Sequence, residues 1–151
     1  MDQARDALVS LFRIVVGMLF ACHGAATLFG VLGGPHGGAA PRFAQWPDWW
    51  AAAIEFGAGG LVTLGLVPRV AALLCSGSMA YAYFTVHQPK SLFPMVNGGE
   101  PAVMFCWSFL MIALIGGGSW SLGRFIARSG RPATGLRAGE SLRVGSGDQA
   151  V

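Results

Sequence analysis

Charged residues are scarce in this chain. Lys, Arg, Asp and Glu together make up 11% of the 151 residues, whereas apolar residues make up 54%. A soluble domain is typically about one quarter charged residues, and it uses them to cover its surface. The composition therefore disfavours a soluble globular protein, and a very hydrophobic soluble helical bundle is the weaker alternative. Lipid is the solvent that this composition fits.

Several kinds of chemical site have no pattern in the sequence. The three cysteines, Cys22, Cys75 and Cys106, include no C-x-x-C pair, so we predict small buried apolar roles rather than a redox pair. The sequence contains no phosphate-binding glycine loop and no nucleophile triad. His23 and His87 have no recognised metal-ligand spacing, which makes a haem or metal site the weaker interpretation. We therefore predict no metal site.

Long apolar runs are what the chain does contain. Four runs approach about 20 residues, the length that crosses about 30 Å of hydrocarbon, and none alternates with period two as barrel strands do. They cover about residues 8–32, 50–67, 70–86 and 101–117. The sequence predicts an all-α fold, an integral membrane four-helix bundle within residues 1–127. An interfacial helix is expected around residues 120–127, and residues 128–151 are predicted to be a basic, disordered cytoplasmic tail.

Basic residues are divided unequally between the two ends of these runs. Arg42 and Lys90 fall in the two longer loops, whereas the other arginines lie near the start of the first run, between the second and third, or after the fourth. By the positive-inside rule, both termini are predicted to be cytoplasmic, and the loops at about 33–48 and 87–99 face outward. The net charge of +3 is thus a topology signal, reinforced by anionic lipid. It does not indicate nucleic acid.

The first run carries one charge and one stripe of small residues. Arg13 lies near its cytoplasmic end and is expected to extend its side chain to the interface. Gly17, Ala21, Gly24 and Ala25 recur at helical spacing. Small residues let two membrane helices approach closely, so this stripe predicts packing against a neighbouring helix.

Helix ends are also indicated by local sequence. Asp48 is a candidate N-cap of the second helix. Pro68 suits the first turn of the third helix, where a missing N–H costs little. Before the fourth helix, Asn97 and Glu100 have the spacing of a capping box.

Ionisable side chains fall at a similar predicted depth on all four helices. They are His23, Glu55, His87 and Glu100. A membrane helix carries such a group favourably only when it faces protein or water, so we expect the four to converge. Lys90 and Asn97, from the loop between the third and fourth helices, would complete the network. The sequence thus predicts a polar pocket near the outer leaflet, suited to a small molecule.

Each of these residues also has a purely structural interpretation. His23 can be a satisfied helix-packing group, Glu100 a helix cap, and Lys90 a contact to lipid headgroups. Glu55 is harder to explain in this way, because a carboxylate so far from a helix end needs a partner. It is therefore a candidate proton donor or acceptor.

Four segments have the pattern of a known family. They are HGAATLFG at residues 23–30, EFGAGGLVTLGLVPRVAALL at 55–74, MAYAYFTVHQPKSLFPMVNGGEPAVMFC at 79–106 and WSLGRF at 120–125. These segments resemble the DoxX family of small four-helix bacterial membrane proteins. The third segment is the most specific, since it holds H-x-P-K and N-G-G-E patterns. The resemblance implies membrane redox chemistry: some members are subunits of thiosulfate:quinone oxidoreductases, and others accompany detoxifying enzymes.

The resemblance implies a subunit of an oxidoreductase in the bacterial plasma (inner) membrane. Glu55, His23 and His87 would then handle protons as catalytic residues, and Lys90, Asn97 and Glu100 would bind the ligand. No cofactor is encoded in the chain, so a bound quinone is expected, with a membrane or soluble redox-enzyme partner supplying electrons.

Two other function classes stay open. The chain can be a non-catalytic anchor or lipophile-binding scaffold, with glycine-rich helix faces packing partner helices and the basic tail holding a soluble enzyme. A transporter is less favoured, because four helices are few and no inverted repeat is visible, so a homo-oligomer would be required.

Overall fold

The computed structural model describes residues 2–35 and 39–129, which form helices and connecting loops. In chain order the elements are α1 (Asp2–Phe29), α2 (Asp48–Leu64), α3 (Pro68–Ala82), η1 (Tyr83–His87), α4 (Pro94–Asn97), α5 (Glu100–Ile115) and α6 (Leu122–Ser129). The predicted all-α fold with four main helices is confirmed. The predicted tail falls largely in residues 130–151, which lie outside the described residues.

The helix bounds differ from those predicted at several ends. α1 begins six residues earlier than residue 8, because its polar first turns continue the helix, and it ends at Phe29. The third apolar run is α3 followed by the π-helical turn η1, in which Gln88 N–H bonds Tyr83 O at 2.8 Å. The short helix α4 was not predicted. α6 covers most of the expected interfacial helix.

The predicted helix caps are partly wrong. Pro68 is in the first turn of α3, as expected. Asp48, however, is the first residue of α2 rather than its N-cap, which is Pro47. α5 has no side-chain cap, because the Oδ1 of Asn97 accepts from the backbone N–H of Gly99, at 2.7 Å, before the helix begins. The capping box is therefore an Asx-type turn in this structure.

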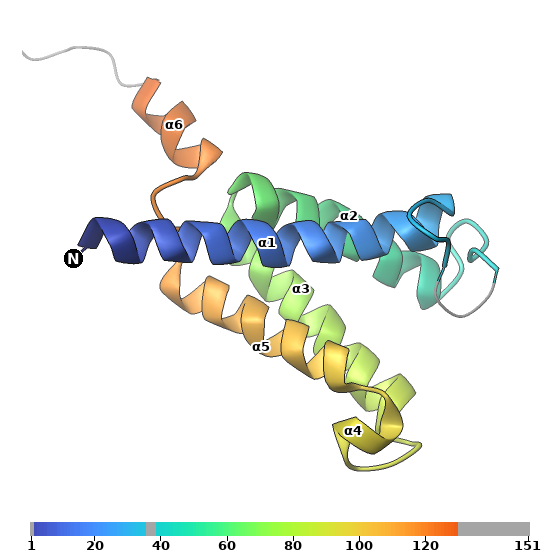
Figure 1. Cartoon of the computed structure of the whole chain (residues 1–151). Helices are drawn as coiled ribbons and strands as arrows, with labels where there is room; N and C mark the ends of the chain where they lie inside the picture. The colour runs from blue at the N-terminus through green and yellow to red at the C-terminus, as the bar shows by residue number, and fades with distance from the viewer. Residues whose placement is uncertain (1, 36–38, 130–151) are drawn as a thin grey trace, which may run out of the picture.

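The main helices pack as two pairs, α1 with α2 and α3 with α5, joined mainly along α2 and α3 (Figure 1). We call the end formed by the start of α1, the turn at residues 65–67 and the end of α5 the proximal end. The other end, at the start of α2, η1 and the start of α5, is the distal end. The two pairs separate toward the distal end, as Figure 1 shows.

Glycines let α1 and α2 touch backbone to backbone. A Cβ built at Gly17 would lie 2.8 Å from Thr63 Oγ1, and one at Gly59 would lie 3.0 Å from the backbone nitrogen of Ala21. At Gly24 a Cβ would overlap the backbone of α2. The small-residue stripe predicted on the first helix is thus confirmed as a packing face.

Larger side chains fill the space between the pairs. Phe20 of α1 packs edge-on against Phe109 of α5, with ring centroids 4.7 Å apart. Both rings are buried, together with Val62 of α2 and Cys75 of α3. Of the other two cysteines, Cys106 is half-buried, whereas Cys22 is exposed, so the prediction of a buried role is wrong for that thiol.

Arg13 is fully buried at the proximal end, with 1% of its surface exposed. Its guanidinium donates to the carbonyl oxygens of Val62, Thr63, Gly117 and Trp120. The donor–acceptor distance is 2.7 Å to Thr63, 2.8 Å to Gly117 and 2.5 Å to Trp120. The expectation that Arg13 extends to the interface is therefore wrong. Carbonyls in the last turn of a helix lack the usual backbone donor four residues on. The guanidinium bonds two of them in α2, and Val62 O accepts in addition from the backbone N–H of Gly65 at 3.1 Å. We call Arg13 and the four residues whose carbonyl oxygens accept its hydrogen bonds the Arg13 network.

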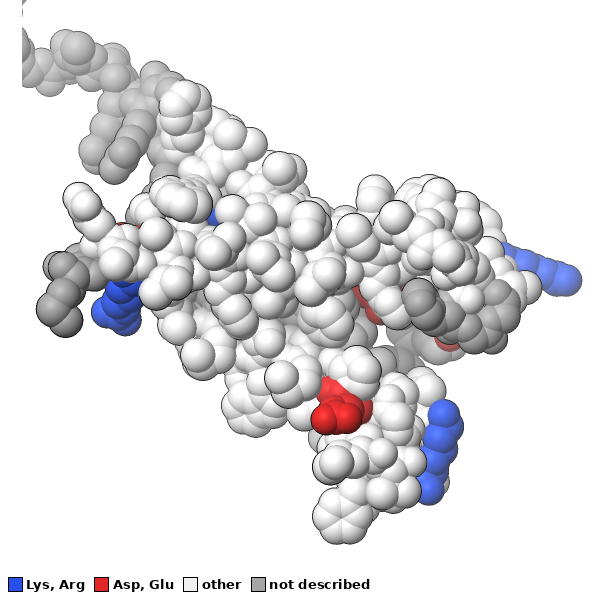
Figure 2. All heavy atoms as spheres, in the orientation of Figure 1, with Lys and Arg blue, Asp and Glu red and all other residues white. Residues whose placement is uncertain are grey.

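The outer surface is apolar over much of its area. Residues such as Leu8, Val70 and Leu114 are exposed by 66 to 70%. In the face shown in Figure 2, uncharged side chains cover the middle of the molecule and most charged atoms lie toward its ends. Within the described residues, two helical stretches are long and apolar enough to cross a membrane, Gln3–Phe29 and Pro68–His87. α2 and α5 have 17 and 16 residues, about 25 Å each, and are short for a full span.

Candidate functional site

The predicted site residues lie in two groups, one on each helix pair. His23 and Glu55 belong to the α1–α2 pair, whereas His87, Lys90, Asn97 and Glu100 belong to the tip of the α3–α5 pair. The structure brings His87 and Asn97 together at this tip, whereas Glu55 lies on the other pair, which separates from the tip toward the distal end (Figure 1).

Glu55 is buried between helices, with 8% of its surface exposed. Its Cβ lies 2.8 Å from the position that a Cβ of Gly24 would take, so the glycine makes room for this side chain. Glu55 is also within electrostatic range of Cys75 on α3. Because His87 follows Cys75 by 12 residues on the same continuous helix, about 18 Å further along, Glu55 and His87 lie at different depths.

His23 precedes Gly24 on α1 but is exposed. Its carbonyl oxygen accepts from Thr27 Oγ1 at 3.1 Å, a bond within the helix. The structure thus places the backbone of His23 beside the helix face that meets Glu55.

Asn97 organises the tip of the α3–α5 pair. The side chain is buried, with 6% exposed. Its Nδ2 donates to Ser91 O at 2.7 Å, and its Oδ1 accepts from Gly99 N–H. Gly99 is buried, and a Cβ built on it would lie only 2.9 Å from the Cβ of His87, so the loop packs closely against that residue. The amide of Asn97 is therefore used to fold the loop.

His87 is held by the same loop. Its Nδ1 lies 3.2 Å from the carbonyl oxygen of Asn97. A carbonyl can only accept, so this hydrogen bond needs the proton on Nδ1, and in the neutral imidazole Nε2 then carries the lone pair. Lys90 and Glu100 flank this tip and are both exposed. The tip thus presents one oriented imidazole beside two exposed charges.

A groove between α2 and α3 opens at the distal end and was not predicted from the sequence. Its volume is about 290 Å³. Its lining residues are Trp46, Pro47, Asp48, Trp50, Ala51, Ile54, Ser78, Tyr81, Ala82, Thr85 and Val86. The rings of Trp46 and Tyr81 lie edge to face, with centroids 6.0 Å apart. Few of the lining residues are polar, as is usual for a small-molecule site.

The sequence does hold a signal for this groove. Ser78, Tyr81, Ala82 and Thr85 recur at spacings of three and four, which places them on one helix face. Trp46 and Trp50 lie at the start of the second apolar run, where aromatic residues are typical of a membrane interface. The sequence does not show that these tryptophans face the polar residues of α3.

The match to a known family covers most of α1 and all of α2, α3 and η1, the helices that carry the groove, but not α5. The sequence model of the DoxX family matches residues 8–88, more than half of the chain. The chain belongs to the DoxX family. This DoxX match includes His23, Glu55 and His87 and ends before Lys90, Asn97 and Glu100.

A relative from Haemophilus influenzae, named only as an uncharacterized protein, is 33% identical over 129 residues. The match covers 81% of this DoxX chain and 92% of the relative. No solved structure matches the chain. DoxX membership and the two long apolar helices together indicate a membrane protein.

Proposed function

We propose that this DoxX protein is a subunit of a membrane redox system and binds a lipophilic ring compound, a quinone, in the distal groove between α2 and α3. The aromatic lining of the groove carries this proposal. A quinone ring can pack against the aromatic side chains of Trp46 and Tyr81, which line the groove. The hydroxyl groups of Ser78 and Tyr81 line the same groove and can donate to a quinone carbonyl.

Proton transfer is assigned to Glu55 and His87. Reduction of a quinone adds protons as well as electrons, so a site for it needs groups that exchange protons. Glu55 follows Ile54, which lines the groove, and His87 follows Val86, which also lines it. Electrons would come from a partner enzyme, because the chain encodes no electron carrier. His23, Lys90 and Glu100 stay predictions as site residues.

The proposal includes four membrane spans in a bacterial inner membrane, with both termini cytoplasmic. The start of α1 and the linker before α6 lie at the same end, since Trp120 N–H bonds Ser10 Oγ at 3.1 Å. The arginines gathered at that end support a cytoplasmic location. A C-terminal tag should be cleaved by added protease in inside-out vesicles but not in intact spheroplasts. Cleavage in intact spheroplasts would refute this topology.

The ligand is tested by mass spectrometry and an optical spectrum of protein gently extracted from its native membrane. We expect a stoichiometric quinone that is lost in Tyr81→Leu. The control Trp107→Leu, which removes a 64% exposed aromatic side chain on α5, should keep it. A wild-type protein without any ring compound would contradict the groove as a quinone site.

Glu55→Gln separates binding from chemistry. The variant should retain the quinone, because Glu55 does not line the groove, and lose quinone-linked turnover by about 100-fold or more. Unchanged turnover in a folded variant would remove Glu55 from the reaction.

The second candidate function is a non-catalytic anchor or scaffold, favoured by one face of α2. A Cβ built at Gly57 or Gly60 would meet nothing within 4 Å, so this face offers a partner helix a close approach. A ligand-free protein that co-purifies with a redox enzyme, and loses it in Gly57→Val, would support the scaffold. Deletion of residues 129–151 should release a soluble partner from membranes if the tail holds it, and retention would count against that role.

A further inference from the structure

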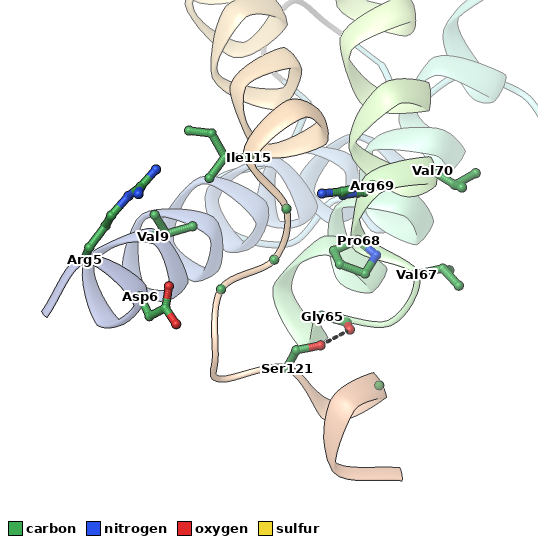
Figure 3. Close-up of a pocket in the computed structure, with 14 residues that line it drawn as sticks. Arg5, Asp6, Val9, Gly65, Val67, Pro68, Arg69, Val70, Ile115 and Ser121 are labelled. Atoms are coloured by element: carbon green, nitrogen blue, oxygen red, sulfur yellow. Dashed lines mark hydrogen bonds between the residues drawn. The ribbon is translucent and has the colours of Figure 1, made fainter. Parts of the chain in front are cut away.

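A second and larger pocket lies at the proximal end, away from the proposed quinone groove. Its volume is about 680 Å³. It is lined by the first turns of α1, the turn between α2 and α3, the first turn of α3 and the linker that follows α5. Figure 3 shows Arg5 and Asp6 from α1, and Arg69 from α3, on either side of the chain that leaves Ile115.

The charge around this pocket is positive. Arg5 and Arg69 line it, opposed by the carboxylate of Asp6. Arg13 lies directly behind the wall, because its Nη1 is 3.0 Å from the position of a Cβ at Gly65 and its Cδ is 3.6 Å from one at Gly117. Two guanidinium groups and one carboxylate thus line the pocket, and a third guanidinium group lies behind its wall.

The positive charge of Arg13 has no carboxylate partner among the described residues. Its hydrogen bonds all go to carbonyl oxygens. Carbonyl dipoles satisfy the N–H groups but do not neutralise the charge, and a buried charge is unfavourable without a counter-charge nearby. A bound anion in the adjoining pocket would supply that counter-charge.

The backbone lining the pocket also suits an anion. α3 begins at Pro68, and the first bond into its turn is Ala71 N–H to Val67 O. The N–H groups of the preceding residues are therefore available at the positive end of the helix dipole. The linker of three glycines lets the chain pass close by, since a Cβ at Gly117 would lie 2.7 Å from Pro68 Cγ.

We propose that the proximal pocket binds a phosphate group, carried by an anionic lipid headgroup or free in solution. Guanidinium groups pair well with phosphate oxygens. The apolar side chains of Val67 and Val70 line the pocket and are 65 and 70% exposed, so acyl chains of a lipid can lie along them. This phosphate site is independent of the quinone groove at the distal end.

The test compares lipid binding by the full-length protein and two double variants. Native mass spectrometry would measure retained lipid after delipidation and incubation with equal phosphatidylglycerol and phosphatidylcholine. Arg5→Gln/Arg69→Gln removes both cationic side chains of the pocket. The matched control, Arg42→Gln/Gln45→Glu, lowers the net charge by the same two units at exposed positions of the distal end. Thermal unfolding in detergent confirms that each variant is folded.

We expect the wild-type protein to prefer phosphatidylglycerol and the pocket variant to lose this preference by about fivefold for each arginine removed. The control should keep it. If inorganic phosphate displaces the anionic lipid, or binds the delipidated wild type but not the pocket variant, the site also accepts a free phosphate. Equal lipid retention in all proteins, without phosphate binding, would overturn the proposal. So would an equal loss in the pocket and control variants, because the effect would then follow net charge alone.

Discussion

At the proximal end, Arg13 bonds carbonyl oxygens that lie 49 to 107 residues away in the chain. At the distal end, the side chain of Asn97 bonds groups two and six residues away. The proximal end therefore joins α1, α2 and the linker after α5 into one unit, whereas the tip of the α3–α5 pair is folded by its own loop. This difference indicates that the proximal end fixes the bundle and that the distal tips can change with little effect on it. The proposed quinone groove lies at the more independent end.

The largest expected effect comes from removing the buried cation. Arg13→Met removes the donor to the carbonyl oxygens of Thr63, Gly117 and Trp120 and should destabilise the protein by about 3 kcal/mol or more. Thermal unfolding in detergent measures the loss. Arg42→Met, at an exposed position in the α1–α2 loop, is the control and should change stability by less than about 0.5 kcal/mol. Equal effects of the two substitutions would refute the contrast between the ends.

Helix contact is tested by adding side chains to two glycines. Gly24→Val should push α1 from α2 and destabilise the pair by about 1–3 kcal/mol, because its Cβ would overlap the backbone near Ala52 and Phe56. Gly57→Val has open space around its Cβ and should leave the isolated protein nearly unchanged. The measurement is again thermal unfolding in detergent, and an equally stable Gly24→Val would show that the interface adjusts freely.

Asn97→Ala tests whether the α3–α5 tip is an independent unit. It removes the bonds to Ser91 and Gly99, at a cost of about 1–2 kcal/mol confined to the loop. Hydrogen exchange should increase in residues 88–99 and stay unchanged in α1 and α2. Faster exchange throughout the bundle would mean that the tip supports the whole fold. Lys90→Ala, which changes an exposed side chain in the same loop, serves as the control.

The smallest expected effect is at the proximal end. Ser121→Ala removes one hydrogen bond, from Ser121 Oγ to Gly65 O at 2.7 Å, drawn in Figure 3. We expect a loss of about 0.5–1 kcal/mol, because the Arg13 network still holds the linker. Thermal unfolding of the double variant Arg13→Met/Ser121→Ala tests whether the two contacts are coupled. If the losses of stability in the two single variants add up to the loss in the double variant, the contacts act separately.

The four main helices could be predicted because each is a long apolar run that ends at helix-breaking residues such as glycine and proline. Pro68 and the left-handed Gly65 separate α2 from α3, and both are visible in the sequence. The burial of Arg13 could not be predicted in this way. A local window shows an arginine near the end of a helix, but the carbonyls that hold it come from distant segments.

The candidate site was located by counting residues along each helix. Counting gives a common depth only if the helices run side by side over their whole length. The two pairs separate toward the distal end, and thus Glu55 and His87 occupy different surroundings. By contrast, Asn97 does lie beside His87, with its carbonyl oxygen 3.2 Å from the Nδ1 of that residue, because the loop between η1 and α5 folds back on the end of η1.

The Arg13 network also has a consequence for the order of synthesis. α1 is made first, and its arginine enters the assembling protein long before Gly117 and Trp120 exist. Until the ribosome has added the linker after α5, part of the guanidinium lacks its final acceptors. A chain that stops early therefore retains an unsatisfied cation in its first helix, and a complete chain does not. The buried arginine thereby distinguishes finished molecules from truncated ones.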